Sequence, residues 1–490
     1  MASRNKSLCL ILLGLLPFCI GNLCRGGWDN RYLSYNNQFR YFVGMDLQHL
    51  SSDSAINYKE ILDTLAKYDI NKIRIWLIAN FLSHWKPNLY PYKRNNGLFD
   101  LYHWDERYWS RLNAVLNYAE SKDIIVEISI FEVSGPIKYF GERAEQPYPY
   151  HNRFNLQNFG KPNPKGTFVP EFFDLNYTEN GIKLIDIQKA LIDKVLKETA
   201  DNPNVYYEVM NEFPGTADMV KNPEVHRWAN EMARYIKSKT DKLVTVHSHG
   251  FGYRRSPAEL EASSSYNWNE DYIDGLNFHL YIFDPNKISQ MLHRHQQKRK
   301  MLNCNEGGGY YDLDRSRGYP HFKMIANKTK LNNEIRAMWG YITAGGYYSF
   351  YTGPVRSVTD FVALGAEKAA QAARKIVETL PFWLMKPVRA DGTEYDNIVL
   401  QGPAPRWQVI AFENQAYLIY FYGHKPSFNH NRSVKIKLPS AQYEYKWYDT
   451  RKWFSPLDSG TASKDIPAPP RPRWDPDSGV ILTLVRIHNR

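Results

Sequence analysis

The chain has 490 residues, of which 43% are hydrophobic and 23% charged, a balance typical of a globular protein. This length exceeds the usual limit for a single hydrophobic core, so we expect one large domain and a smaller one. The net charge of +11 fits nucleic acid, an anionic membrane surface or an acidic polysaccharide as a partner, but the basic residues are scattered and no nucleic-acid-binding motif accompanies them. Nucleic acid is therefore not an expected partner.

The N-terminus has the pattern of a secretory leader. Arg4 and Lys6 precede an apolar stretch, Leu8 to Ile20, that is too short to cross a membrane. We therefore predict a signal peptide over residues 1–26 and a secreted or periplasmic protein without stable membrane association. The sequence before Cys24 matches the pattern of a lipoprotein anchor poorly.

Apolar, strand-like runs then alternate with segments of helical periodicity, which predicts repeated βα units around a parallel sheet. The eight expected strands are Tyr41 to Asp46, Lys72 to Ala79, Ile124 to Phe131, Val205 to Asn211, Leu243 to His247, Gly275 to His279, Met301 to Asn305 and Gly346 to Phe350. The expected helices are Tyr58 to Tyr68, Glu106 to Ser121, Gly181 to Ala200, Glu224 to Lys239, Lys287 to His295, Asn332 to Thr343 and Val362 to Leu380. This alternation predicts an α/β fold, a TIM (β/α)₈ barrel over residues 27–385. An open doubly wound sheet would call for a Gly-rich phosphate turn, which is missing.

One connection of the predicted barrel is long. About fifty residues rich in Pro, Asn, Tyr and Phe separate the third strand from the helix at Gly181. Loops of this length in a compact domain are usually functional or disordered. The aromatic residues predict either an ordered wall over the barrel mouth or an excursion packed on the surface.

After Pro387 the pattern changes to short alternating runs without helices. The expected strands are Trp407 to Phe412, Ala416 to Tyr422, Val434 to Leu438, Tyr443 to Tyr448 and Val480 to Val485. Turn residues separate them, which predicts a small all-β sandwich over residues 386–490. Its role, support of the barrel or contact with a polymer, is left open.

Two of the predicted barrel strands lead directly to a carboxylate. The fourth runs into Asn211 and Glu212, and the seventh into Glu306. Barrels of parallel strands present their catalytic groups at these C-terminal strand ends. Glycoside hydrolysis with retention needs one carboxyl group as acid and base and a second as nucleophile, about 5 Å apart. On the plainer interpretation, both are ordinary loop carboxylates.

These residues resemble the retaining (β/α)₈ glycoside hydrolases of the cellulase-like clan. Members carry an Asn-Glu pair at the end of the fourth strand and a Glu at the end of the seventh, the ordinal places of Asn211, Glu212 and Glu306 in our strand count. The resemblance implies double displacement with Glu306 as the nucleophile and Glu212 as the acid/base. It implies a carbohydrate substrate and no cofactor or metal.

Further positions match the clan in part. Arg74 in the second strand and Tyr281 after the sixth correspond to residues that hold the nucleophile, and His279 to one beside the reacting sugar. Trp76 and Tyr348, in the second and eighth strands, are additional candidates for binding substrate. The eighth strand lacks the Trp usual in the clan's cellulases, and the third ends in a Phe-Glu pair instead of a polar His, so the sugar stays open.

At finer level the chain resembles the apiosidase-like branch of these enzymes. Those proteins follow the barrel with a β domain of a collagen-binding type, similar here to residues 443–451. We infer no collagen binding from that resemblance. The expected activity is hydrolysis of a plant or microbial polysaccharide or oligosaccharide, and the sequence does not indicate an oligomeric state.

Two alternatives belong to other classes. His247, His249 and His279 at the ends of the fifth and sixth strands could instead hold a metal for metal-dependent hydrolysis. A non-catalytic carbohydrate-binding protein would also use the many aromatic rings, 15% of the chain, although core packing accounts for many of these. The two strand-end carboxylates argue against that second alternative.

Overall fold

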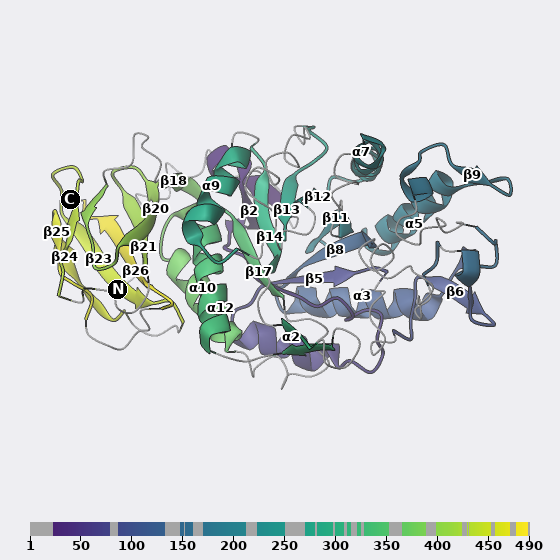
Figure 1. Cartoon of the computed structure of the whole chain (residues 1–490), viewed down its shortest axis with the longest axis horizontal. Coiled ribbons are helices and arrows are strands. Elements are labelled where there is room, and N and C mark those ends of the chain that lie inside the picture. The colour runs from purple at the N-terminus through teal and green to yellow at the C-terminus, as the bar shows by residue number, and fades with distance from the viewer. Residues whose placement is uncertain are drawn as a thin grey trace.

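The computed structural model describes residues 23–78, 87–132, 148–150, 152–159, 170–211, 223–249, 270–279, 282–296, 299–307, 311–314, 321–324, 328–351, 365–388, 398–423, 429, 431–451, 456–470 and 477–488. A barrel with its surrounding helices forms the larger part, and a β module lies at one end of it (Figure 1). This arrangement confirms the predicted fold class, a TIM barrel followed by antiparallel β sheets.

Eight parallel strands close the barrel, with neighbours in the circular order β11-β12-β13-β14-β17-β4-β5-β8. They are β4 (Val43–Asp46), β5 (Lys72–Trp76), β8 (Ile125–Glu132), β11 (Val205–Asn211), β12 (Val244–His249), β13 (Gly275–Phe278), β14 (Met301–Gly307) and β17 (Tyr347–Tyr351). All eight predicted strands are confirmed, and β11 and β14 are the fourth and seventh in chain order. The strands are buried on both faces, as expected for a parallel sheet covered by helices.

The helices that connect the strands begin and end close to their predicted residues. They are α2 (Tyr58–Lys67), α3 (Glu106–Ser121), α5 (Leu184–Glu198), α7 (Pro223–Lys237), α9 (Pro285–Gln296), α10 (Lys328–Thr343) and α12 (Ala366–Val377). α5 starts three residues later than predicted because Ile182–Lys183 (β10) pairs with Thr178–Glu179 (β9). α9 starts earlier, since Pro285 is well suited to the first helical position.

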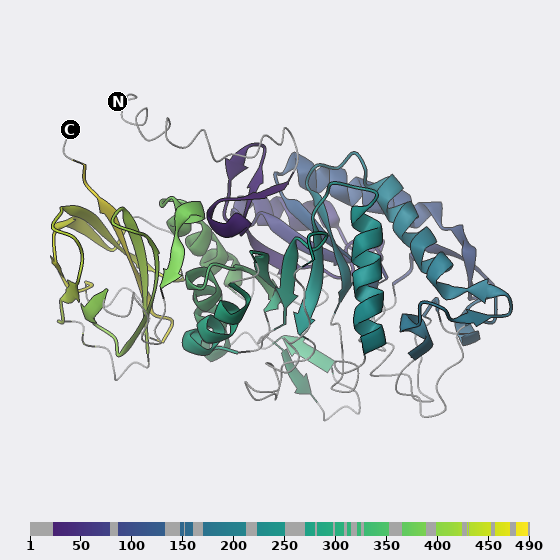
Figure 2. The same ribbon diagram turned by 90° about the horizontal axis from the view of Figure 1, so that it is seen from above.

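A small N-terminal sheet covers the end of the barrel at which the strands begin. Its strands are β1 (Cys24–Gly26), β2 (Tyr32–Tyr35) and β3 (Gln38–Phe39), and Figure 2 shows them in purple at that end. The backbone N–H of Leu33 donates to the hydroxyl of Tyr347, the first residue of β17, at 2.7 Å. The sequence did not predict this sheet, because its strands are only two to four residues long.

The opposite end of the barrel carries the longer connections. Their elements are β6 (Tyr92–Asn95), β7 (Leu98–Trp104), η2 (Asn152–Phe154), η3 (Pro170–Phe173), β15 (Tyr311–Asp314) and β16 (His321–Met324). In the long connection after β8, Tyr150 packs against Phe172, whose ring meets Trp228 of α7 at 5.4 Å between centroids. These described aromatic residues are buried packing groups, whereas residues 133–147 and 160–169 of the predicted wall lie outside the described residues.

The C-terminal module consists of two antiparallel sheets around a core of its own. One sheet has the order β18-β20-β21-β26-β23-β24 and the other β19-β22-β25. The strands are β18 (Lys386–Val388), β19 (Val399–Gln401), β20 (Arg406–Phe412), β21 (Ala416–Tyr422), β22 (Val434–Ile436), β23 (Tyr443–Asp449), β24 (Asp458–Ala462), β25 (Asp465–Ile466) and β26 (Val480–Arg486). The five predicted strands are confirmed, while the four others were missed because they are short or polar.

The module packs directly on helices α9 and α10. The side chain of Gln408 in β20 accepts a hydrogen bond from Thr343 at 2.6 Å and donates to the carbonyl of Pro285 at 2.5 Å. Tyr420 of β21 meets Trp339 of α10 with ring centroids 6.1 Å apart. One face of the larger sheet therefore belongs to the same buried cluster as the barrel.

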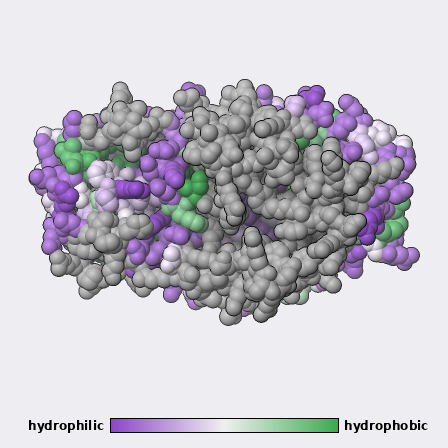
Figure 3. Space-filling model, viewed as in Figure 1, coloured by the Kyte–Doolittle hydropathy of each residue, from purple (hydrophilic) through white to green (hydrophobic). Residues whose placement is uncertain are grey.

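The described surface at both ends of the molecule is mainly hydrophilic in the view of Figure 3, with small hydrophobic patches. Among the helices that the structure describes, none is long and apolar enough to cross a membrane.

Candidate active site

Charged side chains fill much of the barrel interior. Lys72, Arg74 and Trp76 alternate along β5 and share one face of the strand, because successive side chains of a strand point to opposite sides. Lys72 reaches past β4 to Ser349 of β17 and Asn303 of β14, each at 3.0 Å, so this shared face is the interior. A barrel interior is usually packed with branched apolar side chains, so charge at this position is unusual.

Arg74 is the centre of this polar group. Its Nε and Nη2 donate to Oε2 of Glu208 at 3.0 and 2.5 Å, and Nη2 also donates to Oδ1 of Asn211. Its Nη1 lies 3.5 Å from Oδ1 of Asp46 and 3.5 Å from Oε2 of Glu306. One guanidinium group thus joins side chains from four strands, β4, β5, β11 and β14.

Glu306 stands near the end of the seventh barrel strand and is almost fully buried, with 5% of its side chain exposed. Besides Arg74, its Oε2 lies 3.4 Å from Nδ1 of His279, an ion pair when the imidazole is protonated. The pairing of β14 with β17 shifts register between Cys304 and Gly307. Such a bulge re-aims side chains, so Asn305 and Glu306 both contact interior groups although they are neighbours in the strand.

A second polar layer lies deeper in the barrel. Lys72 pairs with Oε2 of Glu127 at 2.9 Å, and the amide of Asn277 donates to Glu127 and Glu208 at 2.7 Å each. Asn305 donates to the same two carboxylates, at 3.0 and 2.8 Å. Buried carboxylates are stable only when they are paired or hydrogen-bonded, and this layer meets that requirement.

The charges of this network set its protonation. Burial raises the pKa of Asp46 to about 7, although Arg74 and a hydrogen bond from Gln48 act in the opposite direction. Burial also disfavours the charge of Glu127, but Lys72 and Arg74 outweigh it and hold the pKa of that carboxyl below its usual value. The surrounding carboxylates raise the pKa of Arg74 well above its usual value, against the effect of burial. Near neutral pH, Arg74 is charged and Asp46 titrates.

The structure brings together four of the residues selected from the sequence: Arg74, Asn211, His279 and Glu306. A fifth, Trp76, has its ring centroid 5.4 Å from the guanidinium carbon of Arg74. Glu212 and Tyr281, the other two selected positions at these strand ends, lie outside the described residues.

The structure does not bring Tyr348 into this group. Tyr348 precedes Ser349, which faces the interior, so its own side chain leaves the strand on the opposite side. Its hydroxyl donates to Glu334 of α10, in the layer between sheet and helix. A role for Tyr348 in binding substrate is therefore not supported. Side chains alternate between the two faces of a strand, and this alternation was the signal that could have excluded Tyr348.

The structure describes the side chains of only two of the three histidines of the metal alternative. The rings of His247 and His279 are in contact, with centroids 4.1 Å apart and planes tilted by 56°. Within the part of the chain that the structure describes, no three His, Cys, Asp or Glu side chains are grouped to hold a metal ion, and the side chain of His249 lies outside that part.

Sequence reasoning missed Asp46, Glu132 and Glu208. Glu132 accepts a hydrogen bond from the Asn211 amide, and Glu208 forms the shortest contacts of Arg74 with a carboxylate. Glu208 stands in the middle of a buried strand, where an ionised side chain needs a partner. A carboxylate at such a position opposite Arg74 was a signal for an interior ion pair.

The carboxyl of Glu334 gives a pH-dependent prediction. Burial raises its pKa from 4.5 to about 7, despite the hydrogen bond from Tyr348. The folded state therefore holds this proton more tightly, and the resulting stability is complete below pH 4.5 and lost as pH rises through 7. Glu334→Gln should raise the free energy of unfolding at pH 8 by up to about 3 kcal/mol relative to wild type. Urea unfolding of both proteins from pH 4.5 to 8 measures this. Parallel curves would contradict it.

The fold defines a class of proteins, the (β/α)₈ barrels with a C-terminal β module. Solved structures with a similar fold were found, although sequence comparisons found none. No protein-family model and no curated protein sequence matches the chain. A structure described as a glycoside hydrolase superposes with a TM-score of 0.61 at 13% identity, covering 96% of this chain and 98% of that chain. The crystal structure of a glycoside hydrolase family 5 protein from Bacteroides vulgatus ATCC 8482 gives 0.61 at 14%, covering 96% and 94%. The chain thus shares the fold of glycoside hydrolases over nearly its whole length.

Proposed function

We propose that this protein is a glycoside hydrolase that acts on a polysaccharide or oligosaccharide by double displacement, with retention of configuration. Glu306 is the nucleophile and Glu212 the acid/base. The supporting observation is that Arg74 contacts both Glu306 and Asn211, the residue directly before Glu212. Glu212 is the next residue after Asn211 in the sequence.

Each contact of Glu306 serves the proposed chemistry. A nearby guanidinium favours the ionised form of a carboxyl group, so Arg74 keeps Glu306 ready to attack the anomeric carbon. Glu212 first protonates the leaving oxygen and then takes a proton from the water that releases the sugar. His279, 3.4 Å from the carboxylate, limits its orientation. Burial of the group strengthens these charge interactions relative to water.

Covalent labelling tests the assignment directly. A 2-deoxy-2-fluoro glycoside with a good leaving group should form a stable ester, and peptide mass spectrometry should find the label on Glu306. A label on another carboxylate, such as Asp46 or Glu208, would overturn the assignment. A panel of polysaccharides with sizing of the products then identifies the sugar, including the finer proposal of an apiosidase-like specificity.

We further propose that the protein is exported, on the basis of the basic and apolar N-terminal segment. β1 lies within the predicted leader and pairs with β2, so removal of all of residues 1–26 would delete a strand. Cleavage before Leu23 would leave this sheet intact. The intact mass of the protein recovered from the medium gives the first residue, and a start beyond Gly26 would contradict cleavage before β1.

A further inference from the structure

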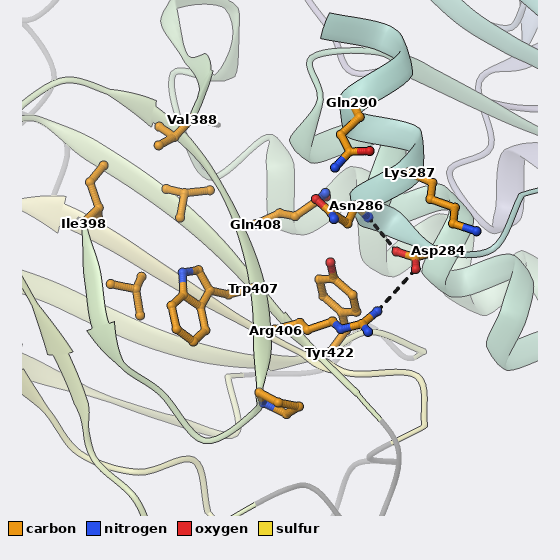
Figure 4. A pocket seen from close by; sticks show the side chains of 13 residues that line it. Asp284, Asn286, Lys287, Gln290, Val388, Ile398, Arg406, Trp407, Gln408 and Tyr422 are labelled. Carbon is orange, nitrogen blue, oxygen red and sulfur yellow. Dashed lines mark hydrogen bonds and ion pairs between the residues drawn. The ribbon is translucent and has the colours of Figure 1, made fainter. Parts of the chain in front are cut away.

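A cleft of about 550 Å³ lies where the C-terminal module meets the barrel (Figure 4). Its volume is within the range of small-molecule sites. The barrel contributes residues at the start of α9, and the module contributes residues of β18, β19, β20 and β21 with their flanks. Asp284, Gln290, Ile398, Arg406, Trp407 and Val409 are among the residues that line the cleft.

The cleft has an apolar side and a polar side. Ile398 and Trp407 lie toward the module in Figure 4, and Asp284 and Gln290 toward α9. Arg406 extends between them, and its Nη1 is 3.3 Å from Oδ2 of Asp284. Trp407 is partly buried, with its ring centroid 6.4 Å from that of Phe421, so one edge of the indole is held and the rest borders the cleft.

The end of β20 explains why the apolar side and the polar side of the cleft are both open to a ligand. Among the described residues, the pairing of β18 with β20 ends at Val388 opposite Val409. Arg406 and Trp407 lie beyond this point and point to opposite faces of their strand. A ligand at this strand edge can therefore meet the indole and the charged pair together.

The cleft lies at the same end of the barrel as Glu306. Asp284 precedes α9 and follows β13, so it belongs to a connection that leaves the C-terminal end of a barrel strand. Asp284 is five positions after His279 in the sequence, and His279 contacts Glu306. A fully extended segment of this length spans at most about 18 Å. An extended polymer in the barrel mouth could thus also reach the cleft.

The lining favours a neutral saccharide. A sugar ring offers C–H groups on its face and hydroxyl groups around its rim, which match an indole beside apolar side chains and a rim of amide, carboxylate and guanidinium groups. Asp284 pairs with Arg406, and Lys287 is the only other charged residue among the described residues that line the cleft, so the lining does not gather the several positive charges that an anionic ligand needs. A peptide strand is a poorer fit, because the open edge of β20 is short and carries a charged Arg406.

We propose that this cleft is an accessory subsite that binds a neutral stretch of a polysaccharide whose scissile bond lies in the barrel mouth. The proposal rests on the glycoside hydrolase function given above and extends it. The subsite holds long substrates by contacts remote from Glu306, with Trp407 as the stacking platform.

Affinity electrophoresis of the full-length chain tests the subsite. Glu306→Gln protein, which should bind without cleaving, is run in native gels containing xylan, glucomannan, mixed-linkage β-glucan or, as a charged comparison, polygalacturonate. It should be retarded by at least one neutral polymer. Adding Trp407→Ala should raise the dissociation constant about tenfold, the usual effect of losing a central aromatic anchor. Because Trp407 also packs in the module, Gln290→Ala with Arg406→Ala provides a second variant with little effect on packing.

Leu400→Ala is the matched control, since Leu400 is 59% exposed on β19 and does not line the cleft. It should leave retardation unchanged. In the active protein, the cleft variants should raise KM for the polymer and leave kcat/KM for a short aryl glycoside unaltered. Equal retardation of all variants, retardation by polygalacturonate alone, or no retardation in any gel would overturn the subsite. Retardation that depends on Trp407, together with no turnover of any polymer or aryl glycoside by the wild-type protein, would instead support the subsite and contradict the hydrolase function.

Discussion

Glu306→Ala should abolish hydrolysis of activated aryl glycosides, with a loss in kcat of at least about 10⁴-fold. The substitution removes the proposed nucleophile and opens a small space beside Arg74, which attracts anions. Added azide should enter this space and attack the anomeric carbon in a single displacement. Release of the aryl group should then recover, and NMR of the product should show a glycosyl azide of inverted configuration.

The companion variant Glu212→Ala separates the two proposed roles. It should retain activity on substrates whose leaving group needs no proton, and azide should give a product of retained configuration. Glu367→Gln is the control, because Glu367 is a buried glutamate on α12, and its kcat should match wild type. Undiminished turnover in Glu306→Ala, with unchanged folding, would refute the nucleophile assignment.

Arg74→Met should both destabilise the fold and remove activity. The guanidinium contacts Asp46, Glu208 and Glu306, and all three carboxylates remain buried when it is lost. Removing one partner of a buried ion pair typically costs about 3–5 kcal/mol. Urea denaturation at pH 7.5 should show a loss of this order, and kcat should fall about 10²- to 10³-fold because Glu306 loses its orienting charge.

Two further variants show whether the network causes this effect. Arg74→Lys keeps the charge without the planar fork, so its stability should lie between those of wild type and Arg74→Met. Loss of the guanidinium leaves the carboxylate of Glu208, its nearest ion-pair partner, buried without it. Combining Arg74→Met with Glu208→Gln removes that negative charge, so the double variant should recover part of the stability but none of the activity. Arg336→Met removes one hydrogen bond to a carbonyl at the module interface and should cost only about 1 kcal/mol. An Arg74→Met protein as stable as Arg336→Met would contradict the central role of Arg74.

The sequence predicted the barrel because its signal is local. Each strand is a buried apolar run, and the connecting helices carry apolar residues at helical spacing, so the eight strands could be counted without tertiary information. The count placed Glu306 on the seventh strand, where the structure has it. The short strands of the N-terminal sheet gave no such signal, since pairing with neighbours distant in sequence stabilises them.

The site was predictable only in part, for a related reason. Residues at strand ends, such as Glu306 and His279, were found because barrels gather these ends at one face, and Arg74 was found through the family resemblance. Asp46 and Glu208 were missed because their role depends on which side of the strand they occupy and on the residue across the barrel. The bulge in β14 is the clearest case: a regular strand would turn Asn305 and Glu306 to opposite sides.

The contact between Leu33 and Tyr347 has a consequence for how the chain reaches its native state. These two residues are 314 positions apart, and barrel closure also needs β17 to pair with β4, as in Tyr348 with Val43. Contacts of such long sequence separation are slow to form, since a large loop must be closed first. Until synthesis has passed Tyr351, β4 keeps an open edge that is a ready template for pairing with another chain. The complete barrel is therefore the smallest part of this chain that can fold without an unprotected strand edge.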